Sequence, residues 1–171
     1  MQQKPQLHSP EFYAQNIAAA QRCLKQFRLL AAPQSVIPDC CFFPPFHLRA
    51  YYMQVCRSGE GYIGHCACTY YADYFGLESV SQSFLTAAEA DQHTAKRGDV
   101  ICKIIVPDRM LIDSLISAAR RFHPPSAAPG ITADGMYGNV RLFEQGEAVS
   151  DIRCSGDSPL MAYLDAISER L

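Results

Sequence analysis

Residues 98–107 read Gly-Asp-Val-Ile-Cys-Lys-Ile-Ile-Val-Pro. The segment Val100–Val106 is rich in β-branched residues and almost continuously apolar, which is typical of a central strand covered on both faces. The residues that follow, from about Asp108 to Arg121, predict a helix that ends before Pro124 and Pro125. We therefore expect a buried strand followed directly by a helix, and the rest of the chain is interpreted around this pair.

The N-terminal part of the chain predicts one long helix. Ser9-Pro10-Glu11 combines a side-chain cap, a proline at the first helical position and an acidic residue in the first turn. Apolar residues then recur at helical spacing as far as Phe27, so the helix, at about residues 9–31, should lay one face on a core. The prolines between residues 33 and 45 end this helix and predict a loop.

The middle of the chain predicts short elements. A strand is expected over Ala50–Val55, followed by a Gly-, Tyr- and Cys-rich loop with short extended pieces over Arg57–Gly76. Val80–Phe84 predicts a short strand. The capping box Thr86-Ala-Ala-Glu89 then opens a helix that runs to about Lys96.

The C-terminal part predicts a hairpin and a helix. Asn139–Phe143 and Ala148–Ile152 are expected to be strands on either side of Gln145-Gly146, and a last helix should cover about residues 158–171. No repeat or domain boundary is visible. The order of elements predicts a single α+β domain over residues 1–171, with a mixed or antiparallel sheet at about residues 50–152 and flanking helices.

Composition excludes several function classes. The 171 residues are 49% hydrophobic and 19% charged, with 15 Lys and Arg against 17 Asp and Glu, which predicts a globular, near-neutral protein. Such a chain lacks the basic stripe of a nucleic-acid-binding protein, and its apolar stretches are too short for membrane insertion. The polar residues 1–10 do not resemble a signal peptide, so we expect synthesis in the cytoplasm. Export by a dedicated bacterial secretion system would need no such segment.

Eight cysteines are the unusual feature of the composition. Without a signal peptide, reduced and buried thiols are the preferred interpretation. Cys56, His65, Cys66 and Cys68 could hold a metal ion, but a C-x-C pair beside a histidine is not the usual zinc spacing, and no metal is expected. A thiol nucleophile at Cys66 or Cys68 is a further possibility that sequence spacing does not decide.

An ordered series of motifs starts at Val80. Val80-Ser81-Gln82-Ser83 lies on a predicted strand and is followed by the capped helix, the strand Val100–Val106 and, later, Tyr137-Gly138-Asn139-Val140-Arg141. This series resembles the middle of mono-ADP-ribosyltransferases of the cholera and pertussis toxin type, between Val80 and Phe143. The resemblance implies an ADP-ribosyltransferase-like fold and a bacterial effector or toxin domain that uses NAD as a substrate and modifies a protein.

The resemblance also implies site residues. An arginine after an early strand, Arg57 or alternatively Arg49, would clamp the pyrophosphate of NAD, and Ser81 and Ser83 would frame the nicotinamide pocket. A carboxylate must stabilise the oxocarbenium-like transition state. The loop at residues 124–135, where the family places its glutamate motif, contains no glutamate. Gln145-Gly146-Glu147 has the Gln-x-Glu form, so either Glu147 is the acid or the domain is catalytically degenerate.

The alternative function is a non-enzymatic protein-binding module of the immunity or adaptor type. Mild acidity, modest size and the unplaced carboxylate all agree with it. A group of tyrosines could contribute to a binding groove, although a half-buried place in the core is the expected role of these residues. The tyrosines are Tyr51, Tyr52, Tyr62, Tyr70, Tyr71 and Tyr74.

Overall fold

Six antiparallel strands form one open sheet with helices on both faces. The structure is a computed structural model that describes residues 8–43, 49–70, 100–123, 136–156 and 158–171. The elements are α1 (Pro10–Gln26), the 3-10 helix η1 (Pro33–Ser35), β1 (Val36–Phe43), β2 (Arg49–Ser58), β3 (Gly61–Tyr70), β4 (Val100–Ile105), α4 (Arg109–Arg120), β5 (Tyr137–Glu144), β6 (Glu147–Ser155) and α5 (Pro159–Ser168). The predicted single α+β domain is confirmed, and the sheet is antiparallel between all of its neighbouring strands.

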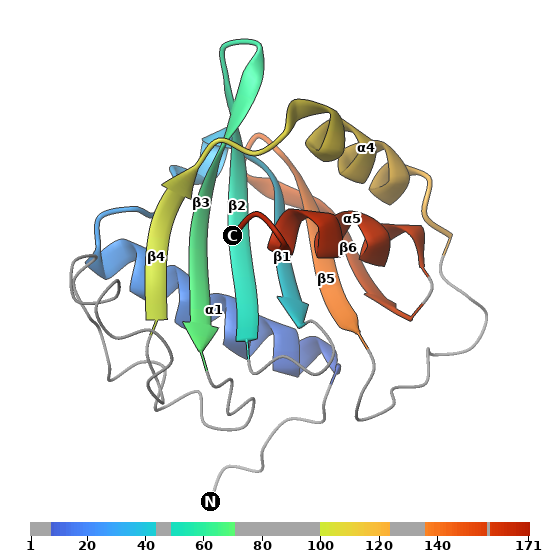
Figure 1. The fold of residues 1–171 in the computed structure, drawn as a ribbon, viewed down its shortest axis with the longest axis horizontal. Helices are drawn as coiled ribbons and strands as arrows, with labels where there is room; N and C mark the ends of the chain where they lie inside the picture. The colour runs from blue at the N-terminus through green and yellow to red at the C-terminus, as the bar shows by residue number, and fades with distance from the viewer. Residues whose placement is uncertain (1–7, 44–48, 71–99, 124–135, 157) are drawn as a thin grey trace, which may run out of the picture.

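The strand order is β4-β3-β2-β1-β5-β6, so β1 and β2 lie in the middle (Figure 1). One pair of hairpins, β2–β3 and β5–β6, extends the sheet on either side of β1. The β2–β3 hairpin projects beyond the rest of the sheet (Figure 1). Strand β1 pairs with β2 on one side and with β5 on the other. The turns of both hairpins therefore lie at the end of the sheet where β1 begins.

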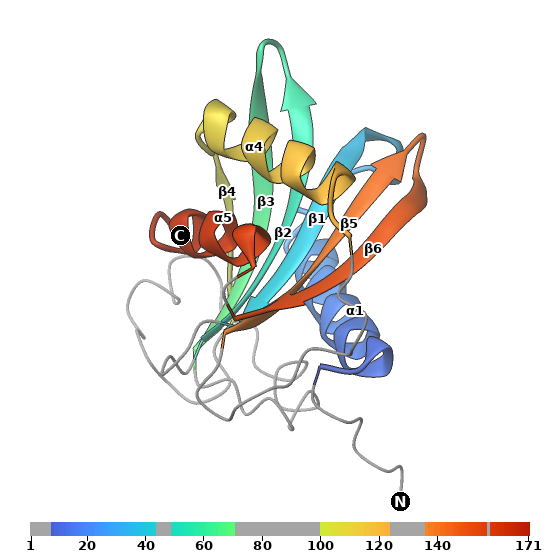
Figure 2. The same cartoon turned by 90° about the vertical axis from the view of Figure 1, so that its right-hand side faces the viewer.

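Each face of the sheet has its own apolar core. Helix α1 lies on one face, and α4 and α5 lie side by side on the other (Figures 1 and 2). Phe12, Ile17 and Leu24 of α1 are buried against Phe43 and Tyr137 of the sheet. On the opposite face, residues of α4 and α5 pack on alternate residues of the same strands; the buried helix residues are Ile112, Leu115, Ile116, Ala119, Leu160, Met161, Leu164 and Ile167. The covering of both faces explains why most residues of β1, β2 and β5 are buried.

The central strand β1 was not predicted, because Pro38 was interpreted as a terminator. The pairing of β1 with β2 shifts register between Val36 and Asp39, which marks a bulge around Pro38. A proline has no N–H to donate to a neighbouring strand, and a bulge is where a strand tolerates one. The predicted loop through residue 43 is therefore wrong, and the sheet begins earlier than residue 50.

Two further predictions about strands are corrected. Gly61–Tyr70 is a continuous strand, β3, instead of a loop with short extended pieces. The strand at residues 100–106 is present as β4, but it lies at the end of the described sheet, and Ile104 is 44% exposed. A β-branched run predicts a strand well, but it does not fix the position of that strand in a sheet.

Other local signals are confirmed. Ser9 Oγ accepts a hydrogen bond of 3.1 Å from the Phe12 N–H and caps α1, although this helix ends at Gln26 and not near residue 31. The helix predicted from about Asp108 to Arg121 is α4, and the structure adds that Asp108 Oδ1 caps it by accepting from the Leu111 N–H at 3.0 Å. The predicted hairpin strands appear as β5 and β6, and the C-terminal helix as α5. The strand expected at residues 80–84 and the helix expected at residues 86–96 lie outside the described residues.

Gly138 tests how closely α5 packs on β5. A Cβ atom at this position would lie 2.9 Å from Leu164 Cδ1 and 3.1 Å from the Cys41 carbonyl oxygen. We expect Gly138→Ala to lower the free energy of unfolding by about 1–3 kcal/mol, because the neighbouring strand cannot move away easily. Urea denaturation measures this. Gly61→Ala is the matched control, since its nearest atom, Ser58 O, is 3.9 Å away; an equal loss in both variants would contradict the close packing.

Candidate functional site

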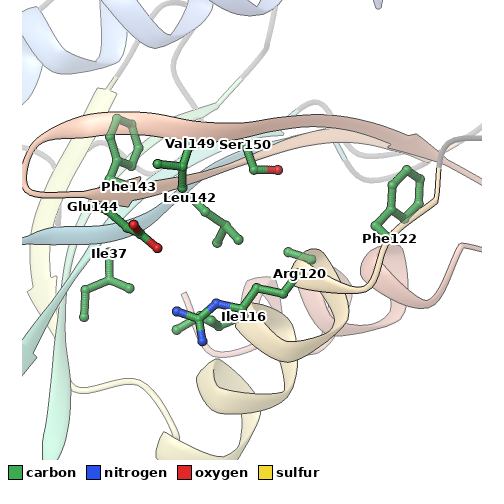
Figure 3. Close-up of a pocket in the computed structure, with 10 residues that line it drawn as sticks. Ile37, Ile116, Arg120, Phe122, Leu142, Phe143, Glu144, Val149 and Ser150 are labelled. Carbon is green, nitrogen blue, oxygen red and sulfur yellow. The ribbon is translucent and has the colours of Figure 1, made fainter.

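A groove runs between α4 and the strand ends on one face of the sheet. It consists of two adjoining cavities of about 380 and 340 Å³ that share Ile37, Ile116 and Arg120. We call it the α4 groove. Figure 3 shows the larger cavity, where Leu142 and Val149 extend from the β5–β6 hairpin toward α4. Val149 is 55% exposed, so the floor of the α4 groove offers apolar surface to a ligand.

Charged side chains line the rim of the α4 groove. Arg57 comes from the end of β2, and Arg120 and Arg121 come from the end of α4. None of these three arginines has a carboxylate within 4 Å among the described residues, where the ion pairs are Arg109–Asp113, Arg141–Asp39 and Arg170–Asp108. The Glu144 carboxylate and the Arg120 guanidinium point into the larger cavity from opposite sides (Figure 3).

Tyr62 fixes one wall of the groove. Its hydroxyl donates a hydrogen bond of 2.5 Å to Asp113 Oδ1 of α4, and the Arg57 guanidinium carbon lies 5.5 Å from the centre of its ring. Burial, and then the hydrogen bond to Asp113, raise the pKa of Tyr62. The phenol therefore stays protonated and joins the β2–β3 hairpin to α4, with Arg57 stacked on its outer side.

The predicted site residues are distributed over two ends of the sheet. Arg57 and Glu147 lie at the same end, on β2 and β6, separated by β1 and β5. Three strand spacings of about 4.8 Å put their backbones about 14 Å apart. Arg49 begins β2 at the other end, so only Arg57 shares an end with Glu147. Ser81 and Ser83 lie outside the described residues.

The Gln145-Gly146-Glu147 motif has a structural role in the hairpin. Glu144 and Glu147 are register partners, so Gln145 and Gly146 form a two-residue loop between β5 and β6. Their φ angles are 52° and 87°, and two positive φ values are what a tight primed hairpin turn requires. The turn accounts for the glycine, and it leaves both glutamates exposed at the end of the groove.

The cysteines are free and buried, all eight of them. Strand alternation places Cys66 and Cys68 in the core under α4 and α5, while His65 faces α1 and its Nδ1 lies 2.6 Å from the Leu29 carbonyl oxygen. Burial raises the pKa of the Cys66 thiol to about 12. No group of three or more His, Cys, Asp or Glu residues in the described part of the chain could hold a metal ion.

The tyrosines of the described strands belong to the core. Tyr51, Tyr52 and Tyr62 are all less than 10% exposed, which makes them more buried than the half-buried role that the sequence predicts. Only Tyr62 contributes to the α4 groove, through Arg57 and Asp113. The side chains of Tyr70, Tyr71 and Tyr74 lie outside the described residues.

On the other face of the sheet, a buried ion pair between β1 and β5 also accepts a hydrogen bond from β2. Arg141 Nε donates to Asp39 Oδ1 at 2.8 Å and its Nη2 donates to Oδ2, while the Tyr52 hydroxyl donates to Oδ2 at 2.7 Å. Gln21 of α1 completes the network by donating to the Tyr52 hydroxyl at 2.8 Å. Asp39 is 1% exposed. Burial alone would lower the pKa of Arg141, but Asp39 more than offsets this effect and raises it.

Sequence reasoning missed Arg120, Arg121 and Ile37 as members of the α4 groove. The two arginines end a predicted helix, where a basic residue is ordinarily explained by the helix dipole. Ile37 lies in β1, where the prolines of the sequence predict a loop. Only the three-dimensional order of the strands brings these residues to Arg57.

Comparison with known proteins finds no matching protein family, no matching curated protein and no matching solved structure. Among the described residues, none of the helices has the length and apolar character needed to cross a membrane.

The ion pair predicts strong coupling between Asp39 and Arg141. Arg141→Met should lower the free energy of unfolding by about 3–5 kcal/mol, because it leaves a buried carboxylate without its partner. The double variant Asp39→Leu/Arg141→Met should lose less than the sum of the single variants, since no charge then remains buried. Urea denaturation of the four proteins measures the coupling. Simple additivity would contradict the arrangement, and Arg121→Met, at an exposed site, is the control with little expected change.

Proposed function

We propose that the protein is a non-enzymatic protein-binding module whose α4 groove takes an acidic, apolar segment of a partner protein. The observation that carries the proposal is the combination of an apolar floor with three arginines that lack a carboxylate partner among the described residues. Guanidinium groups suit carboxylates because they donate two parallel hydrogen bonds to them.

The shape of the α4 groove supports a peptide segment as its occupant. Its two cavities adjoin through Ile37 and Ile116, so a ligand that fills both must be extended. Apolar side chains can lie on Leu142 and Val149, while carboxylates reach Arg57, Arg120 and Arg121. Exposed arginines at the rim also accelerate association with an acidic partner and make it sensitive to salt.

The thiols support binding over thiol catalysis. Burial raises the pKa of Cys40 and Cys41 well above the usual value, and a protonated, inaccessible thiol is a poor nucleophile. Cys66 and Cys68 lie in the same core as Val140 and Leu115, away from His65. The described cysteines therefore act as small core residues.

The test measures the binding of fluorescent peptides in which glutamate alternates with leucine. We expect Arg57→Gln/Arg120→Gln/Arg121→Gln to weaken binding by about tenfold or more, because the carboxylate partners are lost. The matched control, Arg22→Gln/Lys25→Gln/Arg28→Gln, also removes three exposed positive charges, but on the α1 side, and should change the affinity by less than about twofold.

Two outcomes would overturn the binding proposal. One is an equal loss of affinity in the groove variant and the control variant, which would indicate an effect of net charge alone. The other is equal binding of a matched peptide in which glutamine replaces every glutamate. Tighter binding of a single-stranded oligonucleotide than of the acidic peptide would point to a phosphate ligand instead.

A second candidate function is NAD-dependent mono-ADP-ribosyl transfer to a protein, suggested by the resemblance described above. The observation that favours it is that Arg57 and Glu147 lie at the same end of the sheet, where a ligand as long as a dinucleotide can contact both. In this candidate Arg57 clamps the pyrophosphate and Glu147 stabilises the oxocarbenium-like state. Ser81 and Ser83 would frame the nicotinamide.

Nicotinamide release from NAD tests the transferase candidate. An active enzyme should release nicotinamide faster than buffer does, and Glu147→Gln should reduce the rate by about a hundredfold or more, because the charge that stabilises the transition state is lost. Glu169→Gln, at an exposed site beyond α5, is the control and should be fully active. Release no faster than in buffer, or an unchanged rate in Glu147→Gln, would contradict this function and leave the binding proposal intact.

A further inference from the structure

A third cavity lies on the opposite face of the sheet from the α4 groove. It has a volume of about 290 Å³, lies between α1, β5 and β6, and is open to solvent. Its apolar wall comes from the first turns of α1, and its polar floor comes from two pairs of residues on the hairpin. The lining residues are Pro10, Tyr13, Ala14, Ile17, Asn139, Arg141, Asp151 and Arg153. This size is close to the lower end of the range for small-molecule sites, about 300–1,000 Å³.

The four floor residues do not pair across the strands as their register would allow. Arg141 lies opposite Asp151, and Asn139 lies opposite Arg153. However, Arg141 uses Nε and Nη2 to hold the buried Asp39, so Asp151 accepts instead from Asn139 Nδ2 at 2.5 Å. Arg153 Nη1 donates to the His8 carbonyl oxygen at 3.0 Å. Because Arg141 is bonded to the buried Asp39, it does not form an ion pair with Asp151, the acid opposite it on β6.

This arrangement leaves both donors and acceptors available at the cavity. Within the described residues, Arg141 Nη1, the remaining N–H groups of Arg153 and Asp151 Oδ2 have no hydrogen-bond partner. Asp151 and Arg153 are exposed, so a ligand can reach these groups, whereas Asn139 is 2% exposed and its Oδ1, which has no partner in the described part of the chain, is shielded from the cavity.

The charges of the cavity balance. The positive charges of Arg141 and Arg153 equal the negative charges of Asp39 and Asp151 in number. A ligand with a net charge would therefore leave one charge at the cavity without an opposite charge. A ligand with one carboxylate and one ammonium group keeps the balance. Its carboxylate suits the free guanidinium N–H groups, and its ammonium suits the exposed carboxylate of Asp151.

We propose that the cavity between α1 and the β5–β6 hairpin binds a free α-amino acid with an aliphatic side chain, through Arg141, Arg153 and Asp151. The aliphatic side chain lies on Ala14 and Ile17 of α1. The site is separate from the α4 groove, because the sheet lies between them (Figure 2). It requires no chemical step, and it does not depend on the function proposed above.

Calorimetric titration of the full chain with L-leucine tests the site. We expect saturable binding below about 10 mM. N-acetyl-L-leucine lacks the ammonium charge and L-leucinamide lacks the carboxylate, and each should bind at least about tenfold more weakly, because one half of the charge recognition is missing. Binding that is unchanged by either modification, or no binding of L-leucine, would overturn the proposal.

Variants locate the binding site. Asp151→Asn keeps an oxygen for the Asn139 amide, and Arg153→Gln keeps a donor for the His8 carbonyl, so both should melt close to the parent temperature. Each should weaken L-leucine binding by about tenfold. The control pair, Arg120→Gln and Glu144→Gln, removes the same charges from the α4 groove and should leave L-leucine binding unchanged. A loss of binding in the control pair, or unchanged binding in both cavity variants, would exclude this cavity as the site.

Discussion

The ion pair between Asp39 and Arg141 ties the two central strands of the sheet to β5 and to the helix that covers them. A carboxylate in the middle of a central strand is costly to bury unless it is paired and fully hydrogen-bonded. Here Arg141 of β5, Tyr52 of β2 and, through Tyr52, Gln21 of α1 satisfy it. The network therefore fixes the neighbours of β1 on both sides and the position of α1 over the sheet. Such a network favours one arrangement of strands, because a shift in register would leave Asp39 without a partner.

The same interaction shapes the cavity on the α1 face of the sheet, while the opposite face offers a ligand different chemistry. Because Arg141 is turned toward Asp39, the hairpin residues Asn139, Asp151 and Arg153 are free to line a small polar cavity under α1. On the opposite face the apolar core under α4 and α5 ends at Ile37 and Leu142, where the arginines of the α4 groove begin. The two proposed recognition surfaces therefore lie on opposite faces of the sheet and differ in chemistry, one suited to an acidic segment and one to a small zwitterion.

Local signals predicted much of the fold, and long-range pairing explains what they missed. The caps at Ser9 and Asp108 and the Gln145-Gly146 turn are determined by neighbouring residues, so they can be predicted from the sequence. The strand β1 was missed because only a bulge makes Pro38 compatible with it. The β2–β3 hairpin was also missed, although Ser58-Gly59-Glu60-Gly61 carries a turn signal, with Gly59 at a φ of 58°. The α4 groove depends on strand order, which no local pattern encodes.

Hydrogen exchange of the Arg141 Hε proton, followed by NMR, tests the central role of the ion pair most directly. We expect the proton to exchange at least about tenfold more slowly than the Hε protons of Arg57 and Arg120, because it is bonded to the buried Asp39 between α1 and the sheet. The protection should disappear in a folded Asp39→Asn variant, which cannot accept the charged pair of bonds in the same way. Exchange of Arg141 as fast as that of Arg120 in the parent protein would contradict the account.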